Sequence, residues 1–301
     1  MDRSEGAGKG PKIEFHADDY GLFPAQSQRI LDCYRRGRLN GISILPNSRD
    51  LPVCMAMLGS VPEDLAVTVH LNLIEGRCLA DPGEVPLLAD GNGVFRGGFG
   101  RLLLRSYLPG REKLRAQLKK EFSAQIQAVR PYLPQGTPLR LDGHAHYHML
   151  PVAFDAMMDV IREEGLPVGY IRIPREELGL YWRHRRELKD FSPINVVKVL
   201  ILNILAGRNQ RKYGAYLNTL EQKLFLGVFL SGRMYRENVE RILPEAERLA
   251  GEQKRNIEIL AHPGGVYEAA DIARLTNDDD ISFLTSKARD REARMFDRQE
   301  G

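Results

Sequence analysis

Short apolar runs alternate with longer amphipathic segments along most of the chain. The short runs predict buried strands, and the longer segments predict helices with one apolar face. This alternation favours parallel strands joined by crossover helices, which is an α/β fold. The expected strands span residues 12–17, 41–46, 65–69, 138–141, 168–173, 224–230 and 256–261. The expected helices span residues 24–38, 51–58, 111–132, 152–164, 191–211, 237–250 and 285–296.

The length and composition suit a single soluble domain. A chain of 301 residues is normal for one α/β barrel, although two smaller domains would also fit. Apolar residues make up 43% and charged residues 28%, which allows a substantial core. The formal net charge of +3 is small for this size, so we expect no polyanionic partner such as nucleic acid.

The two ends of the chain and its cysteines carry further expectations. Residues 1–12 are polar and rich in glycine, which predicts a disordered tail before a domain that spans residues 13–301. Residues 285–301 are expected to form a charged terminal helix and tail, after an acidic turn at 278–280. The three cysteines show no CxxC spacing, so a reducing cytoplasm fits best.

The segment 174–216 combines an apolar run with basic patches and could be a helical insertion or lid. It could touch a membrane or a glycolipid, but we favour a packed helix with solvated ends. Its most apolar part, residues 194–206, is too short to cross a hydrocarbon core of about 30 Å as a helix. We therefore expect no stable insertion into a membrane.

Three histidines, His144, His146 and His148, follow Asp142 at the end of an expected strand. In an extended chain alternate side chains share a face, so this spacing could aim several imidazoles at one point. Neutral imidazole is the commonest protein ligand for metals. We favour a metal-binding or catalytic role over a histidine-rich loop or a set of hydrogen-bonded core histidines.

Other polar residues also stand where expected strands end. In a βα barrel these ends share one face, where catalytic groups gather. One carboxylate and two imidazoles there would give a three-ligand divalent site that leaves room for water. A second carboxylate could take a proton and a histidine could return one. The candidates are Asp18, Asp19, Asn47, His70, His144, His146, His148 and His262.

The Asp pair and a further candidate, Arg172, depend on conditions. Asp18 and Asp19 are neighbours, so both can reach one site only if the strand bends there, as Gly21 and Pro24 make plausible. Arg172, near the end of the expected strand 168–173, could hold a substrate or pair with surface acids, and we favour the surface pairing.

Residues 15–22, 68–73, 141–148 and 261–264 together resemble the four ordered signatures of the YdjC-like carbohydrate deacetylase family. That family includes diacetylchitobiose deacetylase and a hopanoid-biosynthesis-associated branch, which residues 226–233 also resemble. Tyr20 stands where the family more often has phenylalanine. The resemblance implies a single-domain, distorted (β/α) TIM-like barrel that removes the acetyl group from an N-acetylated amino sugar or glycoconjugate.

The resemblance also implies roles for individual residues. Asp19, His70 and His144 would bind one divalent metal ion, with zinc or magnesium expected and manganese, cobalt or nickel as alternatives. Asp18 would be the general base on a metal-activated water, and His262 the proton donor to the amine. The remaining candidates would contact substrate or support the ligands, and these are Asn47, Asp142, His146, His148 and Arg172.

Two other functions remain open from the sequence. One is a metal-dependent phosphoesterase or amidohydrolase, although HxH motifs in those enzymes usually lie on the first strand, where this chain has an Asp pair. The other is a non-catalytic barrel that binds a carbohydrate or glycolipid. The expected partner is a small N-acetylated sugar, an oligosaccharide or a glycolipid, and the family resemblance suggests a homodimer.

Overall fold

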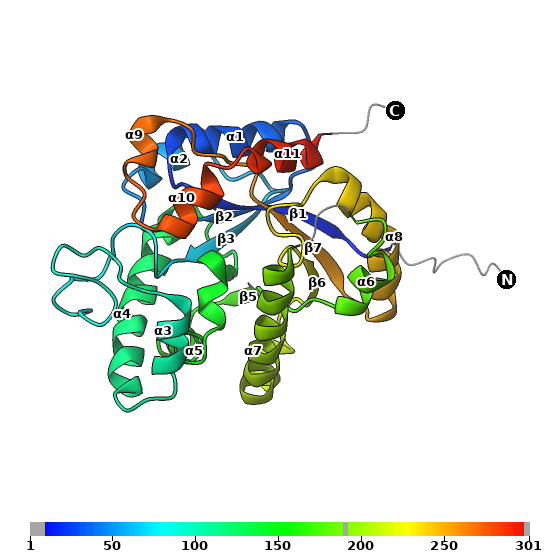
Figure 1. Ribbon diagram of the computed structural model, residues 1–301. Coiled ribbons are helices and arrows are strands. Elements are labelled where there is room, and N and C mark those ends of the chain that lie inside the picture. Colours follow the sequence, from blue (N-terminus) through cyan, green and yellow to red (C-terminus); the bar gives the residue numbers. More distant parts are fainter. Residues whose placement is uncertain (1–9, 189–191, 298–301) are drawn as a thin grey trace.

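A parallel sheet of seven strands forms the centre of the computed structural model, which describes residues 10–188 and 192–297 (Figure 1). In space the strands follow the order β5-β4-β3-β2-β1-β7-β6, and each neighbouring pair is parallel. The strands are β1 (Ile13–Tyr20), β2 (Gly41–Ile44), β3 (Ala66–Leu71), β4 (Leu139–Gly143), β5 (Val168–Ile171), β6 (Lys223–Leu226) and β7 (Asn256–Ala261).

Helices surround this curled sheet, and the described residues form one α/β domain (Figure 1). The two outer strands, β5 and β6, are joined by no ladder within the described residues, so the barrel is incomplete. The predicted distorted barrel is therefore confirmed. The α-helices are α1 (Pro24–Arg35), α2 (Leu51–Leu58), α3 (Phe99–Arg105), α4 (Arg111–Val129), α5 (Pro151–Glu163), α6 (Leu178–Arg183), α7 (Pro193–Leu217), α8 (Arg236–Glu252), α9 (Ala269–Ile272), α10 (Asp278–Leu284) and α11 (Ala288–Ala293). Short 3-10 helices are η1 (Arg130–Tyr132), η2 (His144–Met149) and η3 (Arg294–Phe296).

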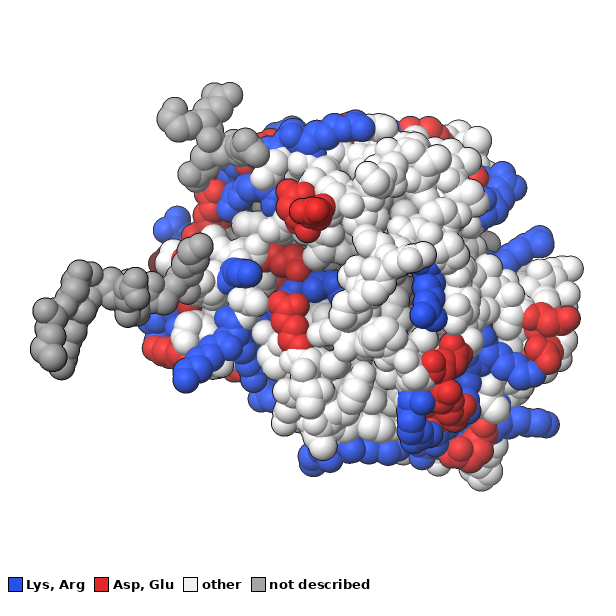
Figure 2. Space-filling view, turned by 180° about the vertical axis from the view of Figure 1, so that it is seen from behind, with Lys and Arg blue, Asp and Glu red and all other residues white. Residues whose placement is uncertain are grey.

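Burial explains why these segments form these elements. Strand residues are buried on both faces of the sheet, as parallel strands covered by helices require. In α4 the apolar residues at helical spacing, Leu114, Leu118, Phe122, Ile126 and Val129, are at most 1% exposed and face the core, as predicted. On the face turned away in Figure 1, charges of both signs are interspersed around a broad area with few charges (Figure 2).

Two predicted elements differ from the structure. The strand expected at 224–230 ends at Leu226, because the buried Glu176 carboxylate accepts the backbone N–H groups of Gly227, Val228 and Phe229 and draws them out of the ladder. The acidic residues at 278–280 form the first turn of α10 and not a separate turn. Asn277 caps that helix, and acidic side chains suit a helix N-terminus.

The predicted insertion at 174–216 contains α6 and α7, which lie between β5 and β6 in the chain. Its action as a lid stays a prediction. The terminal helix expected at 285–296 is α11 followed by η3. The predicted tail at 1–12 falls largely outside the described residues, as do 298–301.

Candidate metal centre and active site

The end of β1 bends, which brings two neighbouring carboxylates to one site. The register between β1 and β2 shifts between Ala17 and Tyr20, and Asp19 adopts a left-handed φ of 70°. Such an irregularity re-aims side chains at the end of a strand, and Asp tolerates this backbone region better than most residues. Asp18 and Asp19 are both buried there, so the bend expected from the sequence is present.

The histidine cluster does not lie on a strand, so the predicted alternation of its side chains is wrong. Strand β4 ends at Gly143, and His144 begins the tight turn η2. Within that turn Ala145 and His146 have left-handed φ values of 46° and 61°. The turn sends the three imidazoles in different directions, and only His144 reaches the Asp pair.

Asp19, His70 and His144 converge, although they come from three different strand ends. The Nδ1 of His144 lies 2.8 Å from Asp19 Oδ1, and the Nε2 of His70 lies 3.4 Å from the same oxygen. One ligand atom from each of the three residues can be chosen so that all lie within 4.8 Å of one another. All three side chains are buried. We call these three residues the Asp-His-His cluster.

The Asp-His-His cluster fits a divalent cation. The buried Nε2 of His70 has no hydrogen-bond partner among the described residues, although its ring is fixed at the other nitrogen. A buried nitrogen without a partner is costly, and a cation at that point would satisfy it. One carboxylate and two imidazoles are also the ligand types of catalytic zinc sites.

A further carboxylate lies at the far nitrogen of each histidine of the Asp-His-His cluster. Asp142 Oδ1 accepts a hydrogen bond from His70 Nδ1 at 2.7 Å, and its supporting role at a metal stays a prediction. Asp280 Oδ2 lies 3.1 Å from His144 Nε2. Carboxylates in this position fix the tautomer and orientation of ligand histidines. Asp280 was not predicted as a site residue, because its acidic run resembles a solvated turn in sequence.

The surroundings of the cluster favour positive charge at its centre. Burial opposes protonation of His70, but Asp142 and Asp18 outweigh it and raise its pKa to about 9. Burial is likewise outweighed at His144, where Asp280 and Asp19 hold the pKa well above its usual range. At Asp19 burial opposes ionisation, yet His144 and His70 hold the pKa well below normal. A cation placed here would meet carboxylates that are already ionised.

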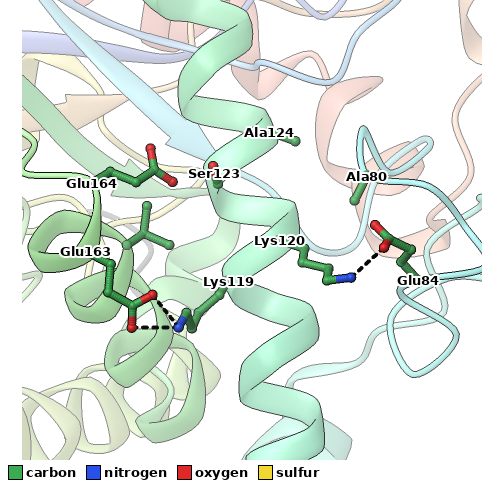
Figure 3. A pocket seen from close by; sticks show the side chains of 9 residues that line it. Ala80, Glu84, Lys119, Lys120, Ser123, Ala124, Glu163 and Glu164 are labelled. Carbon is green, nitrogen blue, oxygen red and sulfur yellow. Dashed lines mark hydrogen bonds and ion pairs between the residues drawn. The ribbon is translucent and has the colours of Figure 1, made fainter.

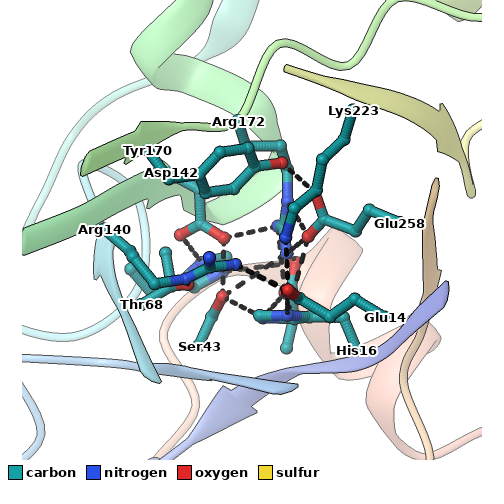
Figure 4. Close-up of polar contacts among 12 residues, drawn as sticks. Glu14, His16, Ser43, Thr68, Arg140, Asp142, Tyr170, Arg172, Lys223 and Glu258 are labelled. Atoms are coloured by element: carbon teal, nitrogen blue, oxygen red, sulfur yellow. Dashed lines mark hydrogen bonds and ion pairs between the residues drawn. The ribbon is translucent and has the colours of Figure 1, made fainter. Parts of the chain in front are cut away.

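Arg172 lies beneath the site and connects its carboxylates. Its guanidinium contacts Asp18 at 2.9 Å. It also contacts Asp142 at 2.6 Å and Glu258 at 2.7 Å (Figure 4). Arg172 and its three partners are all buried, so the expected pairing with surface acids is wrong. The arginine instead fixes Asp18 beside the Asp-His-His cluster.

Figure 4 also shows a second group of acids and histidine deeper in the sheet, which we call the inner network. Its acids and histidine are Glu14, His16 and Glu258, and its cations include Arg140 and Lys223. Glu14 accepts from Arg140 at 2.7 Å and also pairs with Lys223. Each acid of the inner network therefore already has a protein cation.

His262 lies on the other side of Asp18, at the end of β7. Its Nε2 is 3.9 Å from Asp18 Oδ2, and its ring stands edge-on to Phe283 at a centroid distance of 4.9 Å. Burial lowers the pKa of His262, so its neutral form is favoured. Asp18 and His262 thus flank the Asp-His-His cluster within reach of one another.

The remaining predicted residues brace the site at a distance. The Nε2 of His148 donates to the backbone carbonyl of Arg172 at 2.8 Å, and His146 packs against Phe225 at a centroid distance of 5.8 Å. Asn47 donates to the carbonyls of Glu75 and Arg77 and so pins the loop after β3. These contacts give the three residues a structural role in the folded chain.

A surface hollow of about 480 Å³ lies elsewhere, between α4, α5 and the loop near Ala80 (Figure 3). Its charged walls are already paired, Lys119 with Glu163 and Lys120 with Glu84. The hollow includes none of the site residues above. We therefore place the candidate site at the Asp-His-His cluster and not in this hollow.

Fold and site together define an α/β-barrel protein with a candidate divalent-metal centre at the carboxyl ends of its strands. The chain belongs to the YdjC-like protein family, whose model matches residues 12–300.

Several relatives share part of this chain. A chitooligosaccharide deacetylase of Yersinia pestis is 32% identical over 183 residues, which cover 59% of this chain and 66% of the relative. A carbohydrate deacetylase of Thermoanaerobacter pseudethanolicus is 27% identical, with 54% and 61% covered, and one of Danio rerio is 27% identical, with 55% and 50% covered. The matched part thus spans between half and just under two thirds of these relatives.

A solved structure has the same fold. It is a candidate cellobiose-phosphate cleavage protein of Enterococcus faecalis V583, with a TM-score of 0.63 and 18% sequence identity. The likeness covers 97% of this chain and 92% of that one. At this level of identity the comparison supports the barrel alone.

Proposed function

We propose that this protein is a metal-dependent hydrolase that removes the acetyl group from an N-acetylated amino sugar or glycoconjugate. The observation that carries the proposal is the convergence of Asp19, His70 and His144 beside Asp18 and His262. Relatives named carbohydrate deacetylase and chitooligosaccharide deacetylase support the same reaction.

The metal would be held by Asp19, His70 and His144. A divalent ion there supplies Lewis acidity, which polarises a carbonyl oxygen and makes water more acidic. The ligand set suits zinc, and magnesium is the principal alternative. Asp142 and Asp280 keep the two ligand imidazoles in place through their far nitrogens.

The protein's own groups would move the protons. Asp18 takes a proton from water as the water oxygen bonds to the acetyl carbon. The C–N bond then breaks, and the departing amine needs a proton. Neutral His262, 3.9 Å from Asp18, can accept the captured proton and pass it to the amine, so that acetate and free amino sugar leave. Arg172 holds Asp18 in position throughout.

The proposed compartment is the cytoplasm. All three cysteines are free thiols, which suits a reducing environment. No helix within the described residues is long and apolar enough to cross a membrane.

An acetate-release screen tests this function. N-acetylated monosaccharides, chitooligosaccharides and glycolipids are incubated with chelator-treated enzyme and with the same enzyme after zinc or magnesium is added. We expect acetate and free amine in equal amounts, only with metal. Phosphate released from sugar phosphates without acetate would favour a phosphoesterase, and ligand binding without any product would favour a carbohydrate-binding protein.

A further inference from the structure

Exposed apolar side chains gather on two segments of the barrel's outer surface. Of the eleven large apolar side chains that are exposed among the described residues, seven lie on α7 or on α3 and its following turn. We propose that these two segments form a docking surface for an anionic lipid bilayer. The seven residues are Leu104, Tyr107, Leu108, Ile194, Val197, Leu200 and Ile204.

The exposed residues of α7 form one face of the helix. Ile194, Val197, Leu200 and Ile204 follow spacings of three, three and four residues, which keep side chains on one side. Ile204 is 70% exposed, the largest value among the seven. The opposite face is buried against the barrel, so this half of α7 is apolar on two faces, although it also carries the exposed Lys198. A helix of this kind normally has a second partner.

Both segments abut the beginning of α5, so they lie on the same side of the molecule. The backbone N–H of Val152 donates to Ser106 Oγ at 3.3 Å, which fixes the end of α3. Arg208 of α7 contacts the carbonyl of Pro151 and pairs with Asp155 of α5. Figure 1 shows α3, α5 and α7 side by side.

The two segments that carry this surface also contact η2, the turn that follows β4. Phe99 at the start of α3 stands edge-on to Tyr147 of η2 at a centroid distance of 5.4 Å. Asn209 of α7 donates to the carbonyl of Met149 in the same turn at 3.0 Å. His144 begins this turn, so both segments that carry the docking surface pack against the turn that holds a residue of the candidate site.

The charge of the two segments identifies the partner. Residues 91–111 and 192–220 contain no Asp or Glu, but they include eight Lys or Arg residues. Asp155 is paired with three of these cations, Arg111, Arg208 and Lys212. The flanking acids Asp90 and Glu112 lie 3.7 Å from Arg96 and 4.0 Å from Arg111, so the eight cations face three acids. The cations include Lys198 and Arg211, which are exposed on α7.

Anionic lipid headgroups match this combination better than a second copy of the chain. Near an anionic membrane each Lys or Arg is attracted, while apolar side chains can enter the headgroup boundary. A two-fold contact through the same surface would bring two surfaces of net positive charge together. No helix of the described residues could span the bilayer, so the protein would lie on its surface.

Flotation with lipid vesicles tests the proposal on the full chain. We expect the wild type to float with vesicles that contain phosphatidylglycerol, and to be released from them by salt, but not to float with pure phosphatidylcholine. The double variant Val197→Ser/Ile204→Ser should lower the partition coefficient about tenfold or more. Lys198→Glu/Arg211→Glu should reduce it similarly at low salt. Val53→Ser on α2, which removes an apolar side chain that is 53% exposed elsewhere, should change nothing.

Two results would overturn the proposed docking surface. Absence of wild-type binding to anionic vesicles would do so, as would variants that bind as well as the wild type. Sedimentation velocity serves as the second measurement: a dimer that dissociates in Val197→Ser/Ile204→Ser, without vesicle binding, would assign the surface to a second copy. Circular dichroism confirms that the variants are folded, and hydrolase activity plays no part in the readout.

Discussion

The Asp-His-His cluster and the inner network are built from the same residue types, yet only one of them suits a metal. In the inner network Arg140 and Lys223 already neutralise Glu14. Among the described residues no Lys or Arg contacts Asp19 in the Asp-His-His cluster, and the buried Nε2 of His70 has no hydrogen-bond partner. The number of protein cations, and not the number of acids and histidines, therefore distinguishes a binding site from a structural network.

Removing one histidine from each group is the strongest test of this difference. His70→Gln should lose bound zinc on dialysis and lower acetate release at least about 10³-fold, because metal assistance contributes several kcal/mol to such a reaction. The matched change His16→Gln in the inner network should leave metal content unchanged. Elemental analysis and the acetate assay measure both. Equal loss of metal in the two variants would contradict the distinction.

Substitutions should also separate the proposed roles of Asp18, the general base, and Asp19, a metal ligand. Asp18→Asn should retain the metal but lower turnover by about 10³-fold, because general-base catalysis typically contributes 10² to 10⁴. Asp142 and Glu258 still neutralise Arg172 in this variant, so the fold should survive. Thermal unfolding provides the control. If Asp18→Asn loses its metal as Asp19→Asn does, then Asp18 is a ligand and not the base.

His148, which donates to the backbone carbonyl of Arg172, should make the stability of the fold depend on pH without taking part in the reaction. Burial lowers its pKa to about 4 from a usual value near 6.5. The unfolded chain binds this proton more readily, so the stabilisation is complete above pH 6.5 and is lost as the pH falls towards 4. The loss should be about 2 kcal/mol at pH 5 and approach about 3 kcal/mol near pH 4.

The variant His148→Gln isolates the contribution of His148 protonation to stability, because the glutamine amide can still donate to the carbonyl of Arg172. Urea unfolding of both proteins at neutral and acidic pH gives the difference. The difference in unfolding free energy between the wild type and His148→Gln should change by about 2 kcal/mol between neutral pH and pH 5, and by about 3 kcal/mol near pH 4. A gap that stays constant from pH 7.5 to pH 5 would show that His148 does not titrate on unfolding.

The sequence predicted the fold and most residues of the candidate site because both depend on local patterns. Strand and helix periodicity placed the barrel, and the position of Asp19, His70 and His144 at strand ends followed from it and from the family signatures. The contacts of Arg172 and Asp280 could not be predicted in this way. Asp280 reaches His144 across 136 residues of chain, and no local spacing encodes such a contact. The turn at His144 was missed because left-handed backbone at Ala145 and His146 has no sequence signal without glycine.

Substitution of Asp280 should have the smallest effect on metal binding, and it tests whether surrounding carboxylates position the Asp-His-His cluster. Asp280→Asn keeps the size of the side chain at His144 Nε2 but removes the charge, and loss of such a supporting carboxylate typically costs about 10- to 100-fold in metal affinity or activity. Asp142→Asn should have a larger effect, because Asp142 also pairs with Arg172.

Competition with a zinc-binding dye measures the metal affinities of both variants. Asp279→Asn, one residue away, is the matched control and should bind metal normally. An unchanged affinity in Asp280→Asn would mean that His144 is held by the turn η2 alone, and the cluster would then owe its geometry to backbone conformation and not to its surrounding carboxylates.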